Sequence, residues 1–495
     1  MANYYVRPLG GSYGLEDGSD YDNAFNGFAD VAGLSATDTI YICGTHTETW
    51  VIPTAAVVYR GDYAPDPGIL DPTSGSNVLY INGLSNVTIQ NITISEIGTT
   101  SGILVNGITN GTTLSGITIS YTGPDRAIYF LGNAHTNFTI SDITINANPT
   151  VPGNTQGIYI FGNSATAGSG GSLSNITITG GVSYLKTDTN HVGVHIDDWN
   201  GLAATNINVT NMHTGIRLTN SDNNNIEIGS IVTCGMGLKS DATGDGYGVL
   251  IEQSSSGNEI RGGLFNGNYQ HYVDAATGGS NKVYSNIMIN PIVNSISYVA
   301  NAAGGVIANN TILHEPTDIE GHGIAVQNGG VSTACTIRNN IVTCGTTGTN
   351  IQCVAIGGVS GTNYDDVDID NNNYYVTNSA KLGKIGVTEY TTLSNWQTAL
   401  IADANVSSND ANSIETDPLL SAGYKIRSTS PAVGLGVDWW TAVSVTPLDY
   451  AGESYPTTNI NPGAYMGVYA LTSVGSMGSS QNIRRLMRRG RPGYR

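Results

Sequence analysis

Four polar side chains that could do chemistry, His195, Asp197, Arg217 and Glu252, stand at equivalent places in or just after short apolar triplets. If the first and third residues of each triplet point inward, the middle residue and the residue two further along point outward. Neighbouring strands lie about 4.8 Å apart, so Asp197 and Glu252, two strands apart, would be separated by roughly 9–10 Å. That separation is typical of the two acids of an inverting glycosidase. The alternative interpretation is an ordinary solvated sheet face.

Aromatic residues occupy the same two outward columns next to this polar group. Tyr129 and Tyr159 precede His195 in the first column, and Phe161 precedes Asp197 in the second. Aromatic faces stack on sugar rings, and flanking polar groups bind hydroxyls or carboxylates. We therefore expect Tyr129, Tyr159 and Phe161 to bind a glycan substrate.

Two patterns raise the question of a metal ion. His191 and His195 are four residues apart, which in a strand separates them by about 13 Å, so they are not expected to share an ion. Asp366, Asp368 and Asp370 alternate with apolar residues and share one face, where Ca²⁺ could ease their repulsion. An acidic edge facing water is the favoured interpretation, and no cofactor is predicted.

A repeated phrase predicts the elements that position these residues. An apolar triplet and a Gly/Asn-rich turn are followed by a segment such as Asn91-Ile92-Thr93-Ile94, and successive isoleucines are 23 to 33 residues apart where the register is clear. A unit of this size must stack on copies of itself to bury its apolar face. Asn in the turns tolerates left-handed backbone and can bond to its neighbours in the stack. The second half of the phrase recurs as Gly116-Ile117-Thr118-Ile119, Asp142-Ile143-Thr144-Ile145, Asn175-Ile176-Thr177-Ile178, Asn206-Ile207-Asn208-Val209, Asn286-Ile287-Met288-Ile289 and Asn340-Ile341-Val342.

The chain divides into four predicted regions. Residues 1–75 form an N-terminal cap, in which the apolar spacing over Asp20 to Ala32 predicts a helix. Residues 76–376 form roughly ten to twelve coils of two or three short strands each. Residues 377–471 form a C-terminal cap with a helix over Thr392 to Ala402. Residues 472–495 form a flexible basic tail.

The C-terminal cap carries a family resemblance. Together with the coils, it resembles the right-handed parallel β-helix proteins of the pectin-lyase-like superfamily, which include polysaccharide lyases, glycoside hydrolases and phage tailspikes. The resemblance implies an all-β, single-stranded right-handed parallel β-helix with a helical N-terminal cap and an irregular C-terminal cap. It also implies that Arg217 could act on the α-carbon of a uronate, as lyases of the superfamily do, and that a homotrimer is possible. The stretches that carry it are Asp370-Asn371-Asn372-Asn373-Tyr374-Tyr375, Leu393-Ser394-Asn395-Trp396-Gln397, Asn412-Ser413-Ile414, Asp417-Pro418-Leu419, Ser430-Pro431-Ala432-Val433-Gly434 and Asn461-Pro462-Gly463-Ala464-Tyr465.

Charge and composition restrict the partners. The formal net charge is −19, which argues against nucleic acid as a partner, and no apolar run is long enough for a membrane span. The five cysteines include no CxxC pair, so buried thiols are expected instead of a disulfide framework. The tail combines apolar and basic residues at helical spacing and is predicted to dock on another virion protein. Its docking residues are Ile483, Arg484, Arg485, Leu486, Met487, Arg488 and Arg489.

These observations lead to three hypotheses. The first is an extracellular phage virion protein, like a tailspike or fibre, that contacts bacterial surface polysaccharide and could cleave it. It is suggested by an N-terminus without a usual signal peptide, a capped solenoid and the basic tail. The second is a secreted bacterial polysaccharide lyase or glycoside hydrolase. The third is a structural decoration protein without catalysis.

Overall fold

The apolar triplets form one long sheet of stacked strands in a computed structural model of the chain. The structure describes residues 1–72, 77–97, 101–122, 126–132, 135–147, 155–163, 168–181, 191–235, 246–299, 304–315, 320–326, 335–346, 350–357, 364, 366–441, 448–456 and 458–468. All pairings between named strands are parallel except β39 with β40, and each coil contributes one strand to this sheet. The sheet has fourteen strands: β5 (Trp50–Val51), β8 (Leu79–Asn82), β11 (Ile103–Asn106), β14 (Arg126–Leu131), β16 (Gln156–Phe161), β19 (Val192–Asp197), β22 (Thr214–Thr219), β24 (Tyr247–Gln253), β27 (Gln270–Ala276), β30 (Ile296–Tyr298), β33 (Glu320–Val326), β36 (Asn350–Ile356), β39 (Lys381–Ile385) and β40 (Thr388–Tyr390).

A second sheet of 25 strands collects the rest of each coil, usually as two short strands or as one longer, bent strand. Its strands are β1 (Asn3–Arg7), β2 (Phe25–Asn26), β3 (Thr39–Ile42), β4 (Thr45–His46), β6 (Val58–Arg60), β7 (Ile69–Leu70), β9 (Thr88–Gln90), β10 (Thr93–Ile97), β12 (Thr113–Ser115), β13 (Thr118–Tyr121), β15 (Thr139–Ala147), β18 (Ser172–Gly180), β21 (Ala203–Thr210), β23 (Asn225–Val232), β25 (Glu259–Arg261), β26 (Leu264–Asn266), β28 (Lys282–Tyr284), β29 (Ile287–Ile289), β31 (Gly305–Ala308), β32 (Thr311–His314), β34 (Cys335–Arg338), β35 (Ile341–Thr346), β37 (Val367–Asp370), β38 (Asn373–Asn378) and β41 (Ile414–Glu415). A small sheet pairs β17 (Gly168–Ser169) with β20 (Trp199–Asn200).

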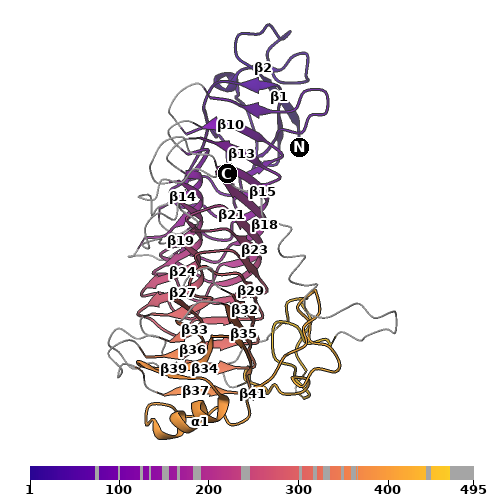
Figure 1. The fold of residues 1–495 in the computed structure, drawn as a ribbon. Helices are drawn as coiled ribbons and strands as arrows, with labels where there is room; N and C mark the ends of the chain where they lie inside the picture. The colour runs from indigo at the N-terminus through magenta and orange to yellow at the C-terminus, as the bar shows by residue number, and fades with distance from the viewer. Residues whose placement is uncertain are drawn as a thin grey trace, which may run out of the picture.

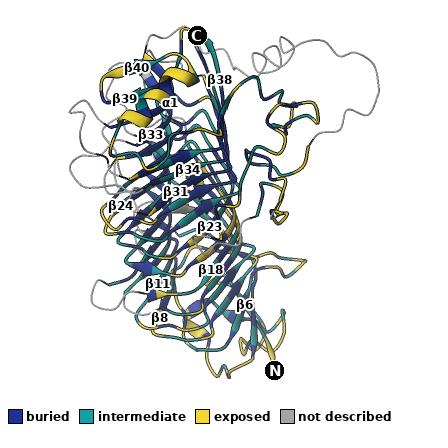
Figure 2. Cartoon of the chain, turned by 90° about the horizontal axis from the view of Figure 1, so that it is seen from below, coloured by how far each residue is buried: buried dark blue, intermediate teal, exposed yellow. Residues whose placement is uncertain are grey.

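The fold is therefore the predicted parallel β-helix, with the two long sheets enclosing one apolar core (Figure 1). Eleven strands of the 14-stranded sheet, from β8 to β36, lie inside the predicted coil region, in agreement with the prediction of ten to twelve coils. Inward residues are buried and outward residues are more exposed along most strands (Figure 2). All five cysteines are free and buried, as expected.

The predicted N-terminal helix over Asp20 to Ala32 is wrong. The apolar residues Ala24, Phe25, Phe28 and Val31 are buried as that pattern required, but β2 and a 3-10 turn, η1 (Phe28–Asp30), bury them. Gly27 has φ 86°, which breaks any helix between the two phenylalanines. Phe28 lies flat on Trp50, with ring centroids 4.2 Å apart. The segment from Asp20 to Ala32 is therefore an irregular connection held by aromatic packing, and not a helix.

The C-terminal end agrees better with prediction. Helix α1 (Leu393–Ala402) begins after Thr392, whose hydroxyl accepts a bond from the Asn395 amide. Its Trp396 and Leu400 are buried against the last coil, at the end of the solenoid. Among the described residues no helix combines the length and apolarity needed to cross a membrane.

The described residues between 416 and 468, the C-terminal segment, lie beside the solenoid, against the outer side of the 25-stranded sheet (Figure 1, orange to yellow). Trp439, Trp440, Tyr455 and Ile460 bury one outward apolar group, and Ala464 helps to bury another. The outward sheet residues that these side chains cover are Tyr284, Ile287, Ile289, Val306 and Ala308. This C-terminal segment therefore covers part of a face that would otherwise expose apolar side chains.

Candidate functional site

Glycines let the site strands stack closely. Gly157, Gly193, Gly215 and Gly248 each directly precede an apolar triplet in the 14-stranded sheet. A Cβ atom on any of them would lie 2.4–2.6 Å from a backbone oxygen of the next coil. Only glycine fits at these positions. The close stacking sets the register between neighbouring strands, and with it which of the following residues point outward.

The predicted outward columns are confirmed. Tyr129 pairs with Tyr159, Tyr159 with His195, and His195 with Arg217. In the second column Phe161 pairs with Asp197, Asp197 with Thr219, and Thr219 with Glu252. Asp197 and Glu252 are thus two strands apart, as expected.

Hydrogen bonds join these columns across five strands into what we call the polar ladder. The Arg126 Nε atom donates to Gln156 Oε1 (3.1 Å), and Gln156 Nε2 donates to His195 Nδ1 (3.1 Å). On its other side His195 Nε2 lies 3.1 Å from Thr219 Oγ1, which donates to Glu252 Oε1 over 3.1 Å. The polar ladder consists of Arg126, Gln156, His195, Thr219, Glu252, Arg217, Tyr129, Tyr159 and Asp197.

His195 is a neutral link in the polar ladder. It is 7% exposed, and burial together with the charges of Arg217 and Arg126 lowers its pKa to about 3. Because Gln156 donates to Nδ1, the neutral ring carries its proton on Nε2 and donates to Thr219. His195 therefore transmits hydrogen bonding but carries no charge at neutral pH.

The two carboxylates have different surroundings. Glu252 Oε1 accepts from Arg217 Nε (2.8 Å) and Nη2 (2.5 Å), in addition to Thr219. Asp197 accepts one bond from the Tyr159 hydroxyl (2.9 Å), and burial raises its pKa, with Asp198 and Glu252 adding to the effect. Arg217 and Glu252 neutralise each other, whereas Asp197 is the acid poised to hold or release a proton.

The aromatic rings face one another and not the solvent. Tyr129 and Tyr159 are stacked with centroids 5.1 Å apart and planes 9° apart, and Tyr159 and His195 with centroids 4.6 Å apart. The Arg126 guanidinium lies over both tyrosine rings, 4.3 Å and 4.9 Å from their centroids. Ring faces that sequence reasoning assigned to sugar stacking are therefore largely occupied. Hydroxyls, ring edges and Phe161 remain for a ligand.

Sequence reasoning missed Arg126 and Gln156. They pair with each other in register, but Ala127 and Gly157 interrupt the alternation before the triplets. Strict alternation from Tyr129 would have pointed Arg126 inward. The small residue before the triplet, Ala127 or Gly157, was the signal that could have revealed the shift.

The other predicted sites have protein partners or lie elsewhere. Arg338 Nη2 and Nε bind the Asp368 carboxylate (2.8 and 3.0 Å), and Asn412 donates twice to Asp370 (2.8 Å each). No group of three or more His, Cys, Asp or Glu suited to a metal ion occurs within the described ranges. The predicted docking residues Ile483 to Arg489 lie outside the described residues.

Comparisons with known proteins concern the fold alone. No family model matches the chain, and no curated protein matches it either. Matches among solved structures include the crystal structure of pectate lyase Pel9A, which is 12% identical, with a TM-score of 0.38 over 94% of this chain and 96% of that one.

Proposed function

We propose that this chain binds a polysaccharide along the outer face of its 14-stranded sheet, at the polar ladder. The supporting observation is a hydrogen-bonded line of side chains that crosses five neighbouring strands. Strands are spaced about 4.8 Å apart, close to the length of one sugar residue in an extended chain. A glycan lying along the solenoid axis would meet a new set of polar groups at each residue.

The chemistry of the polar ladder favours recognition by hydrogen bonds. Arg126 and Arg217 supply guanidinium donors, and the half-buried Asp197 carboxyl supplies an acceptor. Phe161 lies beside Tyr159 with ring centroids 5.8 Å apart and adds an apolar contact. This combination suits a hydroxyl-rich ligand that also carries carboxylate groups.

Cleavage is the second candidate, and the surroundings of Asp197 favour it. A buried carboxyl with a raised pKa suits a general acid that protonates a leaving oxygen. Glu252 would act as the base only after a ligand displaced Arg217 from it. Hydrolysis is thus a proposal that depends on one rearrangement, whereas binding needs none.

We further propose that the polysaccharide lies on a bacterial surface and that the chain is carried on a phage particle, like a tailspike or fibre. The Gly/Ser-rich and basic residues 472–495 support this as an attachment peptide. A secreted bacterial polysaccharide lyase or hydrolase is the competing assignment. Release of sugar by the free protein would favour that assignment, and loss of particle incorporation on tail deletion would favour the phage one.

The test is to incubate the purified protein with bacterial capsular and lipopolysaccharide glycans and to follow binding, reducing ends and unsaturated uronate absorbance. Asp197→Asn is the test variant. Asp198→Asn is the matched control, because Asp198 has φ 52° and asparagine tolerates that conformation. Release lost only in Asp197→Asn would establish a depolymerase. Binding without release would establish an adhesin, and absence of both would show the proposal to be wrong.

A further inference from the structure

A cluster of tyrosines stands on the outer face of the first coils, far from the polar ladder. Tyr5 and Tyr41 are stacked with centroids 5.2 Å apart, and Tyr63 meets both rings edge-on at 5.3 and 6.0 Å. Tyr21 stacks on Tyr63 at 5.0 Å. These four half-buried rings are called the tyrosine platform. Four rings grouped on a surface are more typical of an interface than of solvated protein.

The tyrosine platform already binds arginine side chains of its own coils. The Arg7 guanidinium is 4.3 Å from the Tyr21 centroid and 4.3 Å from that of Tyr13. Arg60 lies 5.9 Å from the Tyr41 centroid and is paired with Asp62. The local chemistry therefore favours guanidinium groups placed against tyrosine rings.

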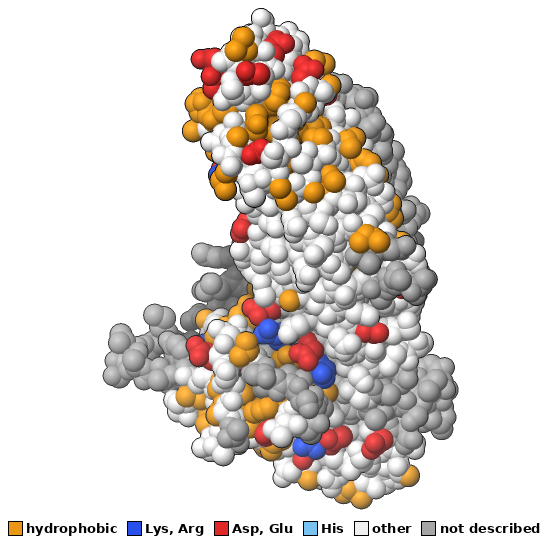
Figure 3. All heavy atoms as spheres, turned by 180° about the vertical axis from the view of Figure 1, so that it is seen from behind, with side chains coloured by type: hydrophobic (Ala, Val, Ile, Leu, Met, Phe, Trp, Pro, Cys, Tyr) orange, Lys and Arg blue, Asp and Glu red, His pale blue; other side chains and the backbone are white. Residues whose placement is uncertain are grey.

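The surroundings of the tyrosine platform are acidic. Residues 1–72 contain ten Asp and Glu and two Arg or Lys, a difference of −8. Figure 3 shows acidic side chains together with hydrophobic ones, a class that includes tyrosine, at the end of the solenoid that holds the N-terminus. An occupant of this surface should be cationic and partly apolar.

The chain itself contains such a segment. Residues 469–495, beyond the last described residue, contain six Arg and no Asp, Glu or Lys. Ile483, Leu486 and Met487 add apolar groups among the arginines. Both the charge and the side-chain types complement the tyrosine platform.

The length of the tail decides between binding within one chain and binding between chains. Ala464 is anchored on Thr311, in the coil of β31 and β32, ten strand spacings or about 48 Å from the Tyr41 strand. For 15 Gly/Ser-rich residues, the number from 469 to 483, random-coil statistics give an average span of about 21 Å. The platform of the same chain therefore lies about twice as far away as this average span, which favours a platform on another copy.

We propose that the basic tail of one copy docks on the tyrosine platform of a second copy. The contact is heterologous, because a tail meets a platform and the pair of copies keeps one unused tail and one unused platform. Such contacts build open head-to-tail chains and not closed rings unless the geometry closes. The sequence-based expectation of another virion protein as the partner becomes the competing outcome.

Two full-length variants test this by complementation. Tyr63→Ala removes the ring that contacts the other three, and replacing Arg484, Arg485, Arg488 and Arg489 by Gln removes four of the six positive charges of the tail. We expect the wild-type chain to associate with rising concentration at low salt in sedimentation velocity, and each variant to sediment as a monomer. Mixed together, the two variants should form a one-to-one complex, because one supplies the tail and the other the platform.

Controls separate docking from folding. Tyr375→Ala changes a tyrosine at the opposite end of the solenoid and should associate like the wild type. Circular dichroism checks that Tyr63→Ala is folded, and the tail variant leaves every described residue unchanged. Raising the ionic strength to about 1 M shortens the Debye length to about 3 Å and should abolish association. A wild-type monomer throughout, association by both variants, or no complex in the mixture would each overturn the proposal.

Discussion

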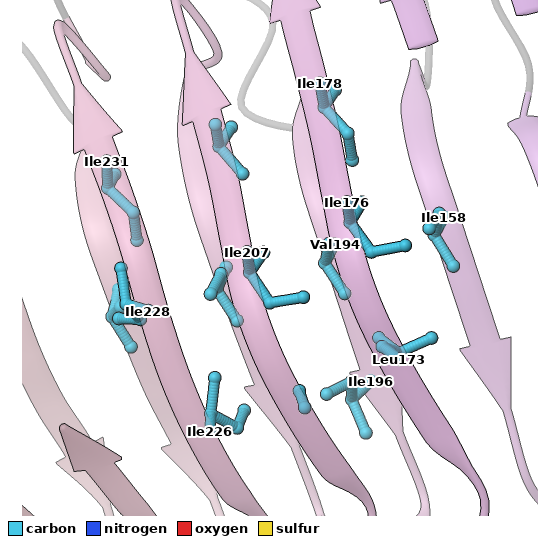
Figure 4. Close-up of a cluster of buried hydrophobic side chains, with 14 of the residues drawn as sticks. Ile158, Leu173, Ile176, Ile178, Val194, Ile196, Ile207, Ile226, Ile228 and Ile231 are labelled. Atoms are coloured by element: carbon cyan, nitrogen blue, oxygen red, sulfur yellow. The ribbon is translucent and has the colours of Figure 1, made fainter. Parts of the chain in front are cut away.

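The two halves of the solenoid fill the same inner corner with opposite chemistry. In the N-terminal half the corner is a stack of isoleucines, all at most 1% exposed: Ile92, Ile117, Ile143, Ile176 and Ile207. Figure 4 shows Ile176 and Ile207 of this stack in neighbouring strands. In the C-terminal half the corner is a stack of fully buried asparagines: Asn286, Asn310, Asn340 and Asn372. Within that stack each Nδ2 donates to the next Oδ1 over 3.1 Å.

The difference shows that stacking, and not a residue type, is what the coil requires. An isoleucine stack gains contact and burial and needs no particular side-chain direction. An asparagine stack satisfies its own amides and also backbone groups, such as the Val283 and Ile307 carbonyls. The apolar stack should tolerate changes of shape, whereas the polar stack should fail when one member is lost.

The largest expected effect on stability comes from placing an asparagine in the isoleucine stack of the N-terminal half. Ile176→Asn would bury an amide between Ile143 and Ile207, which offer no partner, and would lose apolar burial. We expect a loss of about 5 kcal/mol in unfolding free energy. Ile176→Val, the matched control, should cost about 1 kcal/mol. Denaturant unfolding measures both, and equal losses would show that the corner does not discriminate polarity.

Breaking the polar stack should cost somewhat less. Asn310→Ala removes bonds to Asn340 and the Val283 carbonyl and leaves the Asn286 backbone N–H without its side-chain acceptor. We expect a loss of about 3 kcal/mol in unfolding free energy, because buried polar groups lose their hydrogen-bond partners. Asn225→Ala is the control, since Asn225 is exposed and accepts one bond from Arg261. A similar small loss for both variants would contradict a cooperative stack.

The same comparison explains which parts of the fold the sequence could predict. The triplet register was predictable because apolar residues flank each outward side chain in successive coils. The repeated Asn-Ile phrase was misleading in the C-terminal half, where Asn286 aligns with Ile92 and Ile287 aligns with Thr93. This one-residue slip turns Ile287 outward, where the C-terminal segment buries it. A short repeated sequence cannot show that a segment more than a hundred residues further along the chain buries the outer face of these strands.

The site was predictable in part for a related reason. Columns that follow strict alternation, such as His195 and Arg217, could be read from spacing alone. The pairing of Glu252 with Arg217 and the burial of Tyr159 depend on side-chain directions and on neighbouring coils. Those features decide which carboxylate is available to a ligand, and they could be seen only in the structure.

The C-terminal half contains a second asparagine stack, and each of the two stacks ends on a buried acid. The second stack, Asn224, Asn258 and Asn281, reaches Asp274, whose Oδ2 accepts a hydrogen bond from Asn281 Nδ2 at 3.0 Å. Asn372 is followed by Ser413, which donates to Asp410. Burial raises the pKa of Asp274 to about 7 and that of Asp410 to about 6. The isoleucine stack is built of residues that do not titrate.

The Asp274 carboxyl should therefore contribute stability that is lost as the pH rises, whereas the neighbouring His271 and His314, whose pKa values are lowered by burial, contribute with the opposite sign. A raised pKa means that the folded state holds the proton more tightly than the unfolded state, whose Asp titrates near pH 4. The stabilisation by Asp274 is complete below about pH 4 and is lost as the pH rises through about 7, with an expected total fall of about 4 kcal/mol. Hydrogen exchange around β25 to β32 at pH 5 and pH 8, corrected for intrinsic rates, isolates the Asp274 contribution when the wild type is compared with Asp274→Asn, because His271 and His314 are the same in both proteins. From pH 5 to pH 8 the wild type should lose stability relative to Asp274→Asn, and an equal change in both proteins would contradict the role of Asp274.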